Sequence, residues 1–319
     1  MQSLAYTYTK NINDLLAGIE KLRATIHLYP LNSENEIERQ WEQMLERIYW
    51  SLSLTNYSTI SKSQILEIIN NDKKERFRDV EKDILNYKKA LDYIKENWYV
   101  SGEEITSQTI KHLYIISCLP TAFKPKDNFE TIKPGLENVL VYLQKGQEHP
   151  LIQAAIAHFQ ILRSIPFEYG TGRVSRLAVY LFLYKYGYDF RGLLTFEDGI
   201  KKNISLYKRT LSQADNLNTS TYWLEYFLQI IFDSLADKLQ LLKQNSYNTS
   251  FPNKYWQITK RQKEIIRILS QPGTQVSNKD VQKKFTVSQI TASRDLSKLT
   301  KLGLLFAHGK GRAITYIRV

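Results

Sequence analysis

The chain has 319 residues, of which 43% are hydrophobic and 24% charged, as in ordinary globular proteins. No apolar run approaches the roughly 18 residues that span a bilayer, and the N-terminus lacks a basic region followed by an apolar one, so we expect a cytoplasmic protein without membrane contact. The one cysteine, Cys118, excludes an internal disulfide and a multi-cysteine zinc site, and its apolar neighbours predict a buried side chain.

The net charge of +12 is concentrated at the C-terminal end of the chain. Residues 251–319 contain 14 lysines and arginines against 3 acidic residues, whereas residues 1–250 contain 30 against 29. This asymmetry predicts a polyanionic partner for the C-terminal part and a nearly neutral body.

Apolar residues at helical spacing predict a mainly α-helical body. A short extended piece and an amphipathic helix are expected in the first thirty residues, with Pro30 ending that helix. Ser33 is the expected N-cap of the next one. Residues 120–134 are expected to form a loop, and the polar residues 245–252 a linker. The further helices of the body are predicted at residues 34–50, 64–97, 106–116, 136–144, 152–164, 173–186, 200–213 and 222–244.

The last sixty residues show the pattern of three helices followed by two strands. The helices are predicted at residues 259–270, 277–285 and 288–301, and Ser277 is the expected cap of the second, with Asp280 three residues on. From Leu304 onward the sequence alternates around a glycine turn, which predicts a two-stranded wing. This order resembles the winged-helix family.

The winged-helix resemblance implies binding to duplex DNA, with the third helix in the major groove. Side chains at or near the start of that helix are expected to contact base edges: Ser288, Gln289, Thr291, Ser293 and Arg294. Basic residues further on are expected to contact phosphates: Lys298, Lys301, Lys310 and Arg312. The alternative is a module that mediates only protein contacts.

A glycine turn formed by Gly170, Thr171 and Gly172 precedes the predicted helix that contains Arg173 and Arg176. Glycines at a helix start let an anion approach backbone N–H groups, and the helix dipole favours negative charge there. The two arginines are three residues apart and are expected to share a helix face. A P-loop is excluded because no Gly-x-x-x-x-Gly-Lys-Ser/Thr follows a strand.

Residues 165–176 read Ile-Pro-Phe-Glu-Tyr-Gly-Thr-Gly-Arg-Val-Ser-Arg, which resembles the Fic family motif His-Pro-Phe-x-Asp/Glu-Gly-Asn-Gly-Arg-x-x-Arg. The resemblance extends roughly from Glu38 to Leu239. It implies a helical bundle and an enzyme that transfers AMP from ATP to a protein hydroxyl. In the family, the motif histidine is the base, the acidic residue holds Mg²⁺, and the turn and arginines hold the phosphates.

Three motif positions depart from the family pattern. Ile165 stands in place of the histidine and cannot accept a proton, a loss of roughly 10²–10⁴ in rate. Tyr169 replaces the acidic residue and is a poor ligand for Mg²⁺, which argues against a magnesium cofactor. Thr171 replaces the asparagine, and Glu168 is one residue away from the acidic position. We therefore predict no catalytic residue and no metal ligand, but a cradle that still suits ATP or another nucleotide.

The segment after the second predicted helix resembles the inhibitory pattern of many Fic proteins, Ser/Thr-x-x-x-Glu-Gly/Asn. Ser51 and Asn56 match this pattern, while Thr55 stands in place of the glutamate that, in the family, pairs with the second motif arginine, here Arg176. A neutral threonine cannot form that pair. The alternative is that residues 51–61 are a polar connection.

The sequence therefore predicts four regions: an N-terminal segment at residues 1–35, a Fic-like domain at 36–245, a linker at 246–258 and a winged helix at 259–319. The leading hypothesis is a degenerate, non-catalytic Fic protein that regulates transcription or a toxin–antitoxin system through DNA. One alternative is residual AMP transfer with His158 or His112 as base. The other is a scaffold with an empty cradle. Protein partners and oligomeric state are left open.

Overall fold

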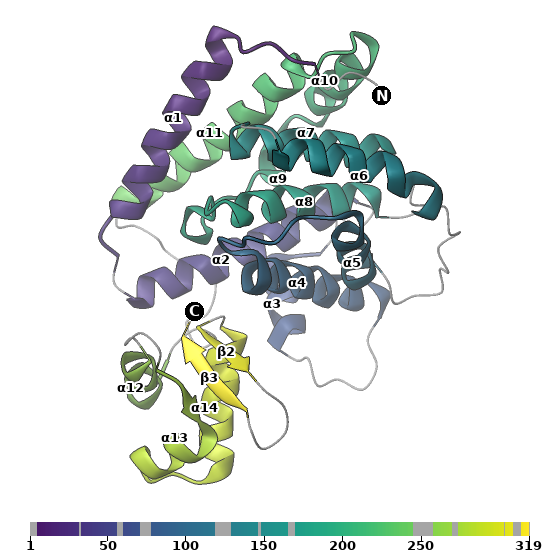
Figure 1. The fold of residues 1–319 in the computed structure, drawn as a ribbon. Coiled ribbons are helices and arrows are strands. Elements are labelled where there is room, and N and C mark those ends of the chain that lie inside the picture. Colours follow the sequence, from purple (N-terminus) through teal and green to yellow (C-terminus); the bar gives the residue numbers. More distant parts are fainter. Residues whose placement is uncertain are drawn as a thin grey trace. The chain divides into compact units, whose positions relative to one another are not determined.

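A computed structural model gives the fold of the chain (Figure 1). It divides into two compact units, residues 1–30 with 42–247 and residues 31–41 with 248–319, which we call the body unit and the C-terminal unit. No helix among the described residues is long and apolar enough to cross a membrane. The structure describes residues 5–31, 33–55, 60–70, 78–118, 129–145, 148–164, 170–244, 258–269, 274–302, 304–308 and 314–318.

The body unit is helical, as the sequence predicts. Helix α2 begins in residues grouped with the C-terminal unit and ends in the body unit. The helices and their bounds are α1 (Lys10–Leu28), α2 (Ser33–Ser53), α3 (Lys62–Asn70), α4 (Asp79–Trp98), α5 (Ser107–Cys118), α6 (Phe129–Lys145), α7 (Pro150–Ser164), α8 (Thr171–Lys185), the 3₁₀ helix η1 (Phe190–Gly192), α9 (Glu197–Lys202), α10 (Ile204–Asn216) and α11 (Thr221–Lys243).

Helices α7 and α8 form the centre of the body unit (Figure 1). Every residue from Leu151 to Ile161 and from Arg173 to Lys185 is buried. A helix that is buried on all sides must be surrounded by other elements, and here α6, α4, α5 and α11 pack against this pair. Any polar side chain on α8 must therefore find its hydrogen-bond partners inside the protein.

Three predictions about the body helices were wrong in detail. Residues 129–134, predicted as loop, belong to α6, which contains Pro134 although proline has no backbone N–H to donate. The single helix predicted at 200–213 is divided at Asn203, whose side chain caps α10 by accepting from the Leu206 N–H. The helix predicted at 64–97 is seen as α3 and α4, and residues 71–77 between them lie outside the described part.

The C-terminal unit has three helices, α12 (Lys260–Ile268), α13 (Asn278–Phe285) and α14 (Gln289–Lys301), as predicted. Side chains of Thr259, Ser277 and Ser288 cap these helices by accepting backbone N–H groups. A cluster of buried apolar residues from all three helices and the sheet forms its core.

A three-stranded antiparallel sheet completes the C-terminal unit, in the order β1-β3-β2. Strands β2 (Leu305–His308) and β3 (Thr315–Arg318) form the predicted wing, with Ala307 opposite Tyr316. The sequence did not predict β1 (Val276–Ser277), because two residues carry no alternation signal. The unit is a winged helix-turn-helix domain.

Candidate functional site

Helix α8 begins at the glycine turn that the sequence singled out. Gly170 is its N-cap, with φ 90°, a left-handed conformation that glycine adopts without strain. A Cβ atom at this position would lie 2.4 Å from the Sγ atom of Cys118, so no other residue fits. Cys118 is buried, as predicted, and its burial raises the pKa of the thiol. This cysteine therefore fills space beneath the turn.

Arg173 lies in the first turn of α8 and is almost completely buried, with 2% of its side chain exposed. Its two terminal nitrogens each donate to one carboxylate oxygen of Asp83 on α4, both at 3.1 Å. One of them also donates to the carbonyl oxygen of Ser117, at 2.8 Å. This two-point ion pair is the strong form of an arginine–carboxylate contact. A phosphate would have to compete with Asp83 for this guanidinium.

Arg176, one turn further along α8, is also buried. Its Nε and one terminal nitrogen donate to the hydroxyl of Ser51 at 3.2 and 3.0 Å, and the same terminal nitrogen donates to the carbonyl oxygen of Ser51 at 3.2 Å. Among the residues that the structure describes, no carboxylate forms an ion pair with Arg176. A buried cation that meets only neutral oxygens is a suitable partner for an anion.

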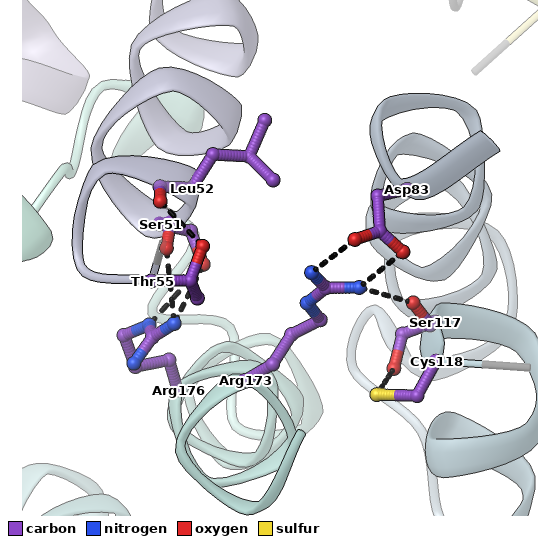
Figure 2. Close-up of polar contacts among 8 residues, drawn as sticks. All are labelled: Ser51, Leu52, Thr55, Asp83, Ser117, Cys118, Arg173 and Arg176. Atoms are coloured by element: carbon purple, nitrogen blue, oxygen red, sulfur yellow. Dashed lines mark hydrogen bonds and ion pairs between the residues drawn. The ribbon is translucent and has the colours of Figure 1, made fainter. Parts of the chain in front are cut away.

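The side chains of Arg173 and Arg176 point in different directions (Figure 2). Arg173 extends to α4 and α5, whereas Arg176 extends to α2. The predicted pair of arginines does not converge on one point in this structure. Gly172 leaves room for Arg176, since a Cβ atom at position 172 would lie 3.2 Å from one of its terminal nitrogens.

The residues of the inhibitory-like segment have different roles. Ser51 is 1% exposed and accepts hydrogen bonds from Arg176. Residues 56–59 of the segment lie outside the described part, so both interpretations of residues 51–61 remain predictions. Thr55 donates its hydroxyl to the carbonyl oxygen of Leu52 at 2.6 Å, three residues earlier, and forms no hydrogen bond with Arg176 (Figure 2). Asn56 lies outside the described residues. Arg176 thus donates to Ser51, whereas the Fic resemblance assigns it a glutamate as its partner.

A buried carboxylate, Glu197, accepts hydrogen bonds from two tyrosine hydroxyls, one of them Tyr87 on α4. Tyr87 donates to one oxygen of Glu197 at 3.4 Å, and Tyr180 donates to the other at 2.7 Å. Glu197 is fully buried, and this burial raises the pKa of its carboxyl group. The charge of Arg176 opposes this rise of the Glu197 pKa, but no ion pair joins the two side chains in the described part of the structure.

The two histidines proposed as substitute bases lie in different surroundings. His158 is fully buried in α7, stacks on Trp223 and shares a hydrogen bond of 2.9 Å with the Tyr207 hydroxyl. Burial, with a contribution from Arg176, lowers the pKa of His158 to about 3, so it is a very weak base. His112 is exposed on α5 and packs its ring against Tyr93.

The start of the motif, including Ile165, Glu168 and Tyr169, lies outside the described residues, so their predicted roles rest on the sequence. Among the described residues, no group of three or more histidine, cysteine, aspartate or glutamate side chains could hold a metal ion. The donor set that is described suits a phosphate-bearing ligand at Arg176.

The predicted DNA-contacting residues lie on or beside α14. Ser288, Gln289, Ser293 and Arg294 are exposed. Thr291 is half-buried, and its backbone N–H and hydroxyl both bond to the capping hydroxyl of Ser288.

The residues predicted to contact phosphates are less fully described. Lys298 is half-buried, and this burial lowers the pKa of its ammonium group. The side chain of Lys301, and the wing residues Lys310 and Arg312, lie outside the described part of the structure. These assignments therefore remain predictions.

Three buried polar residues near the two arginines, Asp83, Tyr87 and Glu197, were not predicted from the sequence. Asp83 and Tyr87 are four residues apart on α4, on the face that packs against α8. Their spacing with apolar neighbours signals a buried face, and a charged residue on such a face requires a buried partner. The partner itself cannot be read from the sequence, because 90 residues separate Asp83 from Arg173.

Comparisons with known proteins find one similarity in the body unit and one in the C-terminal unit. Residues 120–183 match the model of the Fic/DOC family, and residues 261–315 match that of the DeoR-like helix-turn-helix domain. The chain is thus similar to the Fic/DOC family over residues 120–183 and to DeoR-like helix-turn-helix domains over residues 261–315. A search of curated proteins found no match.

Several solved structures share the fold. A Fic family protein from Desulfovibrio desulfuricans is 19% identical with a TM-score of 0.62, and the match covers 99% of this chain and 98% of that one. A Fic domain containing signaling protein from Bacteroides thetaiotaomicron is 18% identical with a TM-score of 0.58, over 76% of this chain and 100% of that one. Fic-1 from C. elegans is 18% identical with a TM-score of 0.57, over 72% and 71%. These likenesses establish the Fic protein fold.

Proposed function

We propose that this chain is a DNA-binding regulator whose Fic-type domain binds a phosphate-bearing ligand and does not transfer AMP. The observation that carries the DNA-binding half is the C-terminal unit. It combines a DeoR-like helix-turn-helix fold with a net charge of +11 over residues 251–319, and its third helix exposes Gln289, Ser293 and Arg294 together. A basic helix-turn-helix domain with polar side chains at the start of its third helix suits the major groove.

The ligand-binding half of the proposal rests on Arg176. Its guanidinium is buried and hydrogen bonds to Ser51 alone, a neutral partner, among the described residues. A phosphate oxygen would supply charge-assisted hydrogen bonds of about 1.5–3 kcal/mol. The glycine turn and the start of α8 lie one turn away and add a favourable helix dipole. ATP or another nucleotide is the class of ligand that this arrangement suits.

The absence of transfer follows from the side chains that would have to move a proton. Ile165 has no titratable atom, and His158 is buried with a pKa of about 3. General base catalysis needs an accessible group with a pKa near the working pH. We therefore assign this domain a role in ligand binding without AMP transfer.

Calorimetric titration of the full chain with ATP and with inorganic phosphate tests the ligand half. We expect weak binding, and Arg176→Gln should weaken it by about ten- to a hundredfold, the equivalent of the lost charge-assisted bonds. Lys201→Gln is the matched control, because Lys201 donates to the Ser53 carbonyl oxygen at the end of the same helix α2. Equal binding by the parent and Arg176→Gln would contradict this half of the proposal and favour an empty scaffold.

A further inference from the structure

One side of α14 points away from the core of the C-terminal unit. Buried residues Ala292, Leu296 and Leu299 pack into that core, and each has no exposed surface. The outward-facing residues of the helix are exposed and mostly polar: Gln289, Ile290, Ser293, Arg294 and Ser297. Their spacing of three and four residues places them on one continuous stripe.

Ile290 is the exception in this polar stripe. It is 65% exposed and takes no part in the buried cluster of the unit. A single exposed isoleucine is ordinary on a protein surface, so its exposure alone indicates nothing. Its position is more informative, because it is the second residue of the helix that the helix-turn-helix fold directs at DNA.

The start of α14 is held firmly in place. Ser288 caps the helix by accepting from the Thr291 N–H, and the amide of Asn278 on α13 donates to the carbonyl oxygen of Gln289 at 3.3 Å. Arg261 and Gln262 of α12 bind the carboxylate of Asp295, which is 4% exposed. These contacts fix the helix on its inner side, so the direction of the outer stripe is set before any partner binds.

We infer that Ile290 is a specificity-determining residue that contacts the methyl group of a thymine in the major groove. This inference rests on the proposed DNA-binding function. The thymine methyl is the apolar group that base pairs present in that groove, and an apolar side chain is its natural contact. The net charge of +11 over residues 251–319 favours a polyanionic partner over a protein partner for the C-terminal unit, and the stripe itself carries Arg294 and no acidic residue.

The neighbours of Ile290 complete a reading surface. Gln289 carries an amide that can bond to adenine at two points, and Arg294, four residues after Ile290, carries the guanidinium group that matches guanine. Ile290 therefore lies between two polar residues that can hydrogen bond to bases. The DNA site should contain a thymine whose methyl group contributes to affinity, so that its removal weakens binding without the loss of a hydrogen bond.

Substitution of deoxyuridine for thymine tests this inference, because it removes only the methyl group. Duplexes are first selected from a random library with the full chain, and each thymine of the selected site is then replaced in turn. At one position we expect the parent to bind the deoxyuridine duplex about three- to tenfold more weakly, the range for loss of one buried methyl group. Ile290→Ala should bind both duplexes with equal affinity.

Ile317→Ala serves as the matched control, because Ile317 is a second exposed isoleucine in the same unit, on β3. This variant should keep the preference for thymine. If the parent binds its selected duplex and no deoxyuridine replacement weakens binding, or if Ile290→Ala keeps the preference, the inference is overturned and DNA binding stands. If no duplex is selected at all, the proposed function fails together with the inference, and the stripe is better explained as a protein interface.

Discussion

The guanidinium of Arg173 and the carboxylate of Asp83 form a two-point ion pair inside the body unit, with both N–O distances at 3.1 Å (Figure 2). The sequence assigns Arg173 to phosphate binding, but the fold gives it an internal counter-charge. Arg176, by contrast, has only neutral partners among the described residues. The two arginines of the motif therefore have different electrostatic roles, and substitutions can separate them.

Asp83→Asn should destabilise the protein strongly. It leaves the Arg173 charge buried without its partner, a change that costs about 3–5 kcal/mol. Urea unfolding of the parent and the variant measures this cost. Asp92→Asn is the control, since Asp92 forms a half-exposed pair with Lys88 on the same helix and should cost less than about 1 kcal/mol. Similar losses for the two variants would mean that the Arg173–Asp83 pair has no special weight.

Thr55→Glu should weaken phosphate binding to the full chain. Thr55 is one turn after Ser51, which holds Arg176, so a glutamate there supplies the counter-charge that this arginine lacks. We expect about a tenfold or greater loss of affinity for inorganic phosphate in calorimetry, in line with one charge-assisted contact. Thr55→Gln is the control: the glutamine side chain is as long as that of glutamate but carries no charge, so this variant should bind phosphate like the parent. Equal affinities of the two variants would place the phosphate away from Arg176.

The purified protein should not attach AMP to itself or to proteins of a lysate. Ile165 cannot accept a proton, and the buried His158 cannot replace it. Incubation with ATP labelled at the α-phosphate, followed by measurement of protein-bound label, checks this expectation. Incorporation by the parent above that of Arg176→Gln would show that another base acts in this domain.

Stability should fall on acidification because of His158. Its folded pKa of about 3 is below the ordinary value of 6.5, so between these values the unfolded chain binds a proton that the folded chain does not. The stabilisation is complete above about pH 6.5 and decreases as the pH falls. His158 alone should remove about 2 kcal/mol between pH 7 and pH 5.

His158→Gln separates this contribution from that of other groups. Glutamine can still bond to the Tyr207 hydroxyl but does not titrate, so the variant should lose less stability between pH 7 and pH 5 than the parent. The raised pKa of Glu197 acts with the opposite sign, because its folded form keeps a proton that the unfolded form releases as the pH rises. That contribution is common to both proteins. Equal losses in urea unfolding at the two pH values would contradict the prediction.

The sequence predicted most helices but few of their polar contacts. Helix periodicity and the Ser277 cap depend on residues close in the chain, and these predictions were confirmed. Pro134 was wrongly taken as a boundary, because tertiary packing of α6 outweighs the preference of a single residue. The partners of Arg173 and Arg176 come from α4, α5 and α2, so they depend on how distant helices pack. Residue spacing within the motif carries no information about that packing.

The salt dependence of DNA binding by the full chain is the decisive test of a DNA-binding role. With about five phosphates neutralised, the logarithm of the affinity should fall against the logarithm of salt concentration with a slope near −4 to −5. Lys310→Ala combined with Arg312→Ala should make the slope shallower for every sequence, whereas Arg294→Ala should mainly relax sequence preference. Failure to shift any duplex at low salt would contradict a DNA-binding regulator.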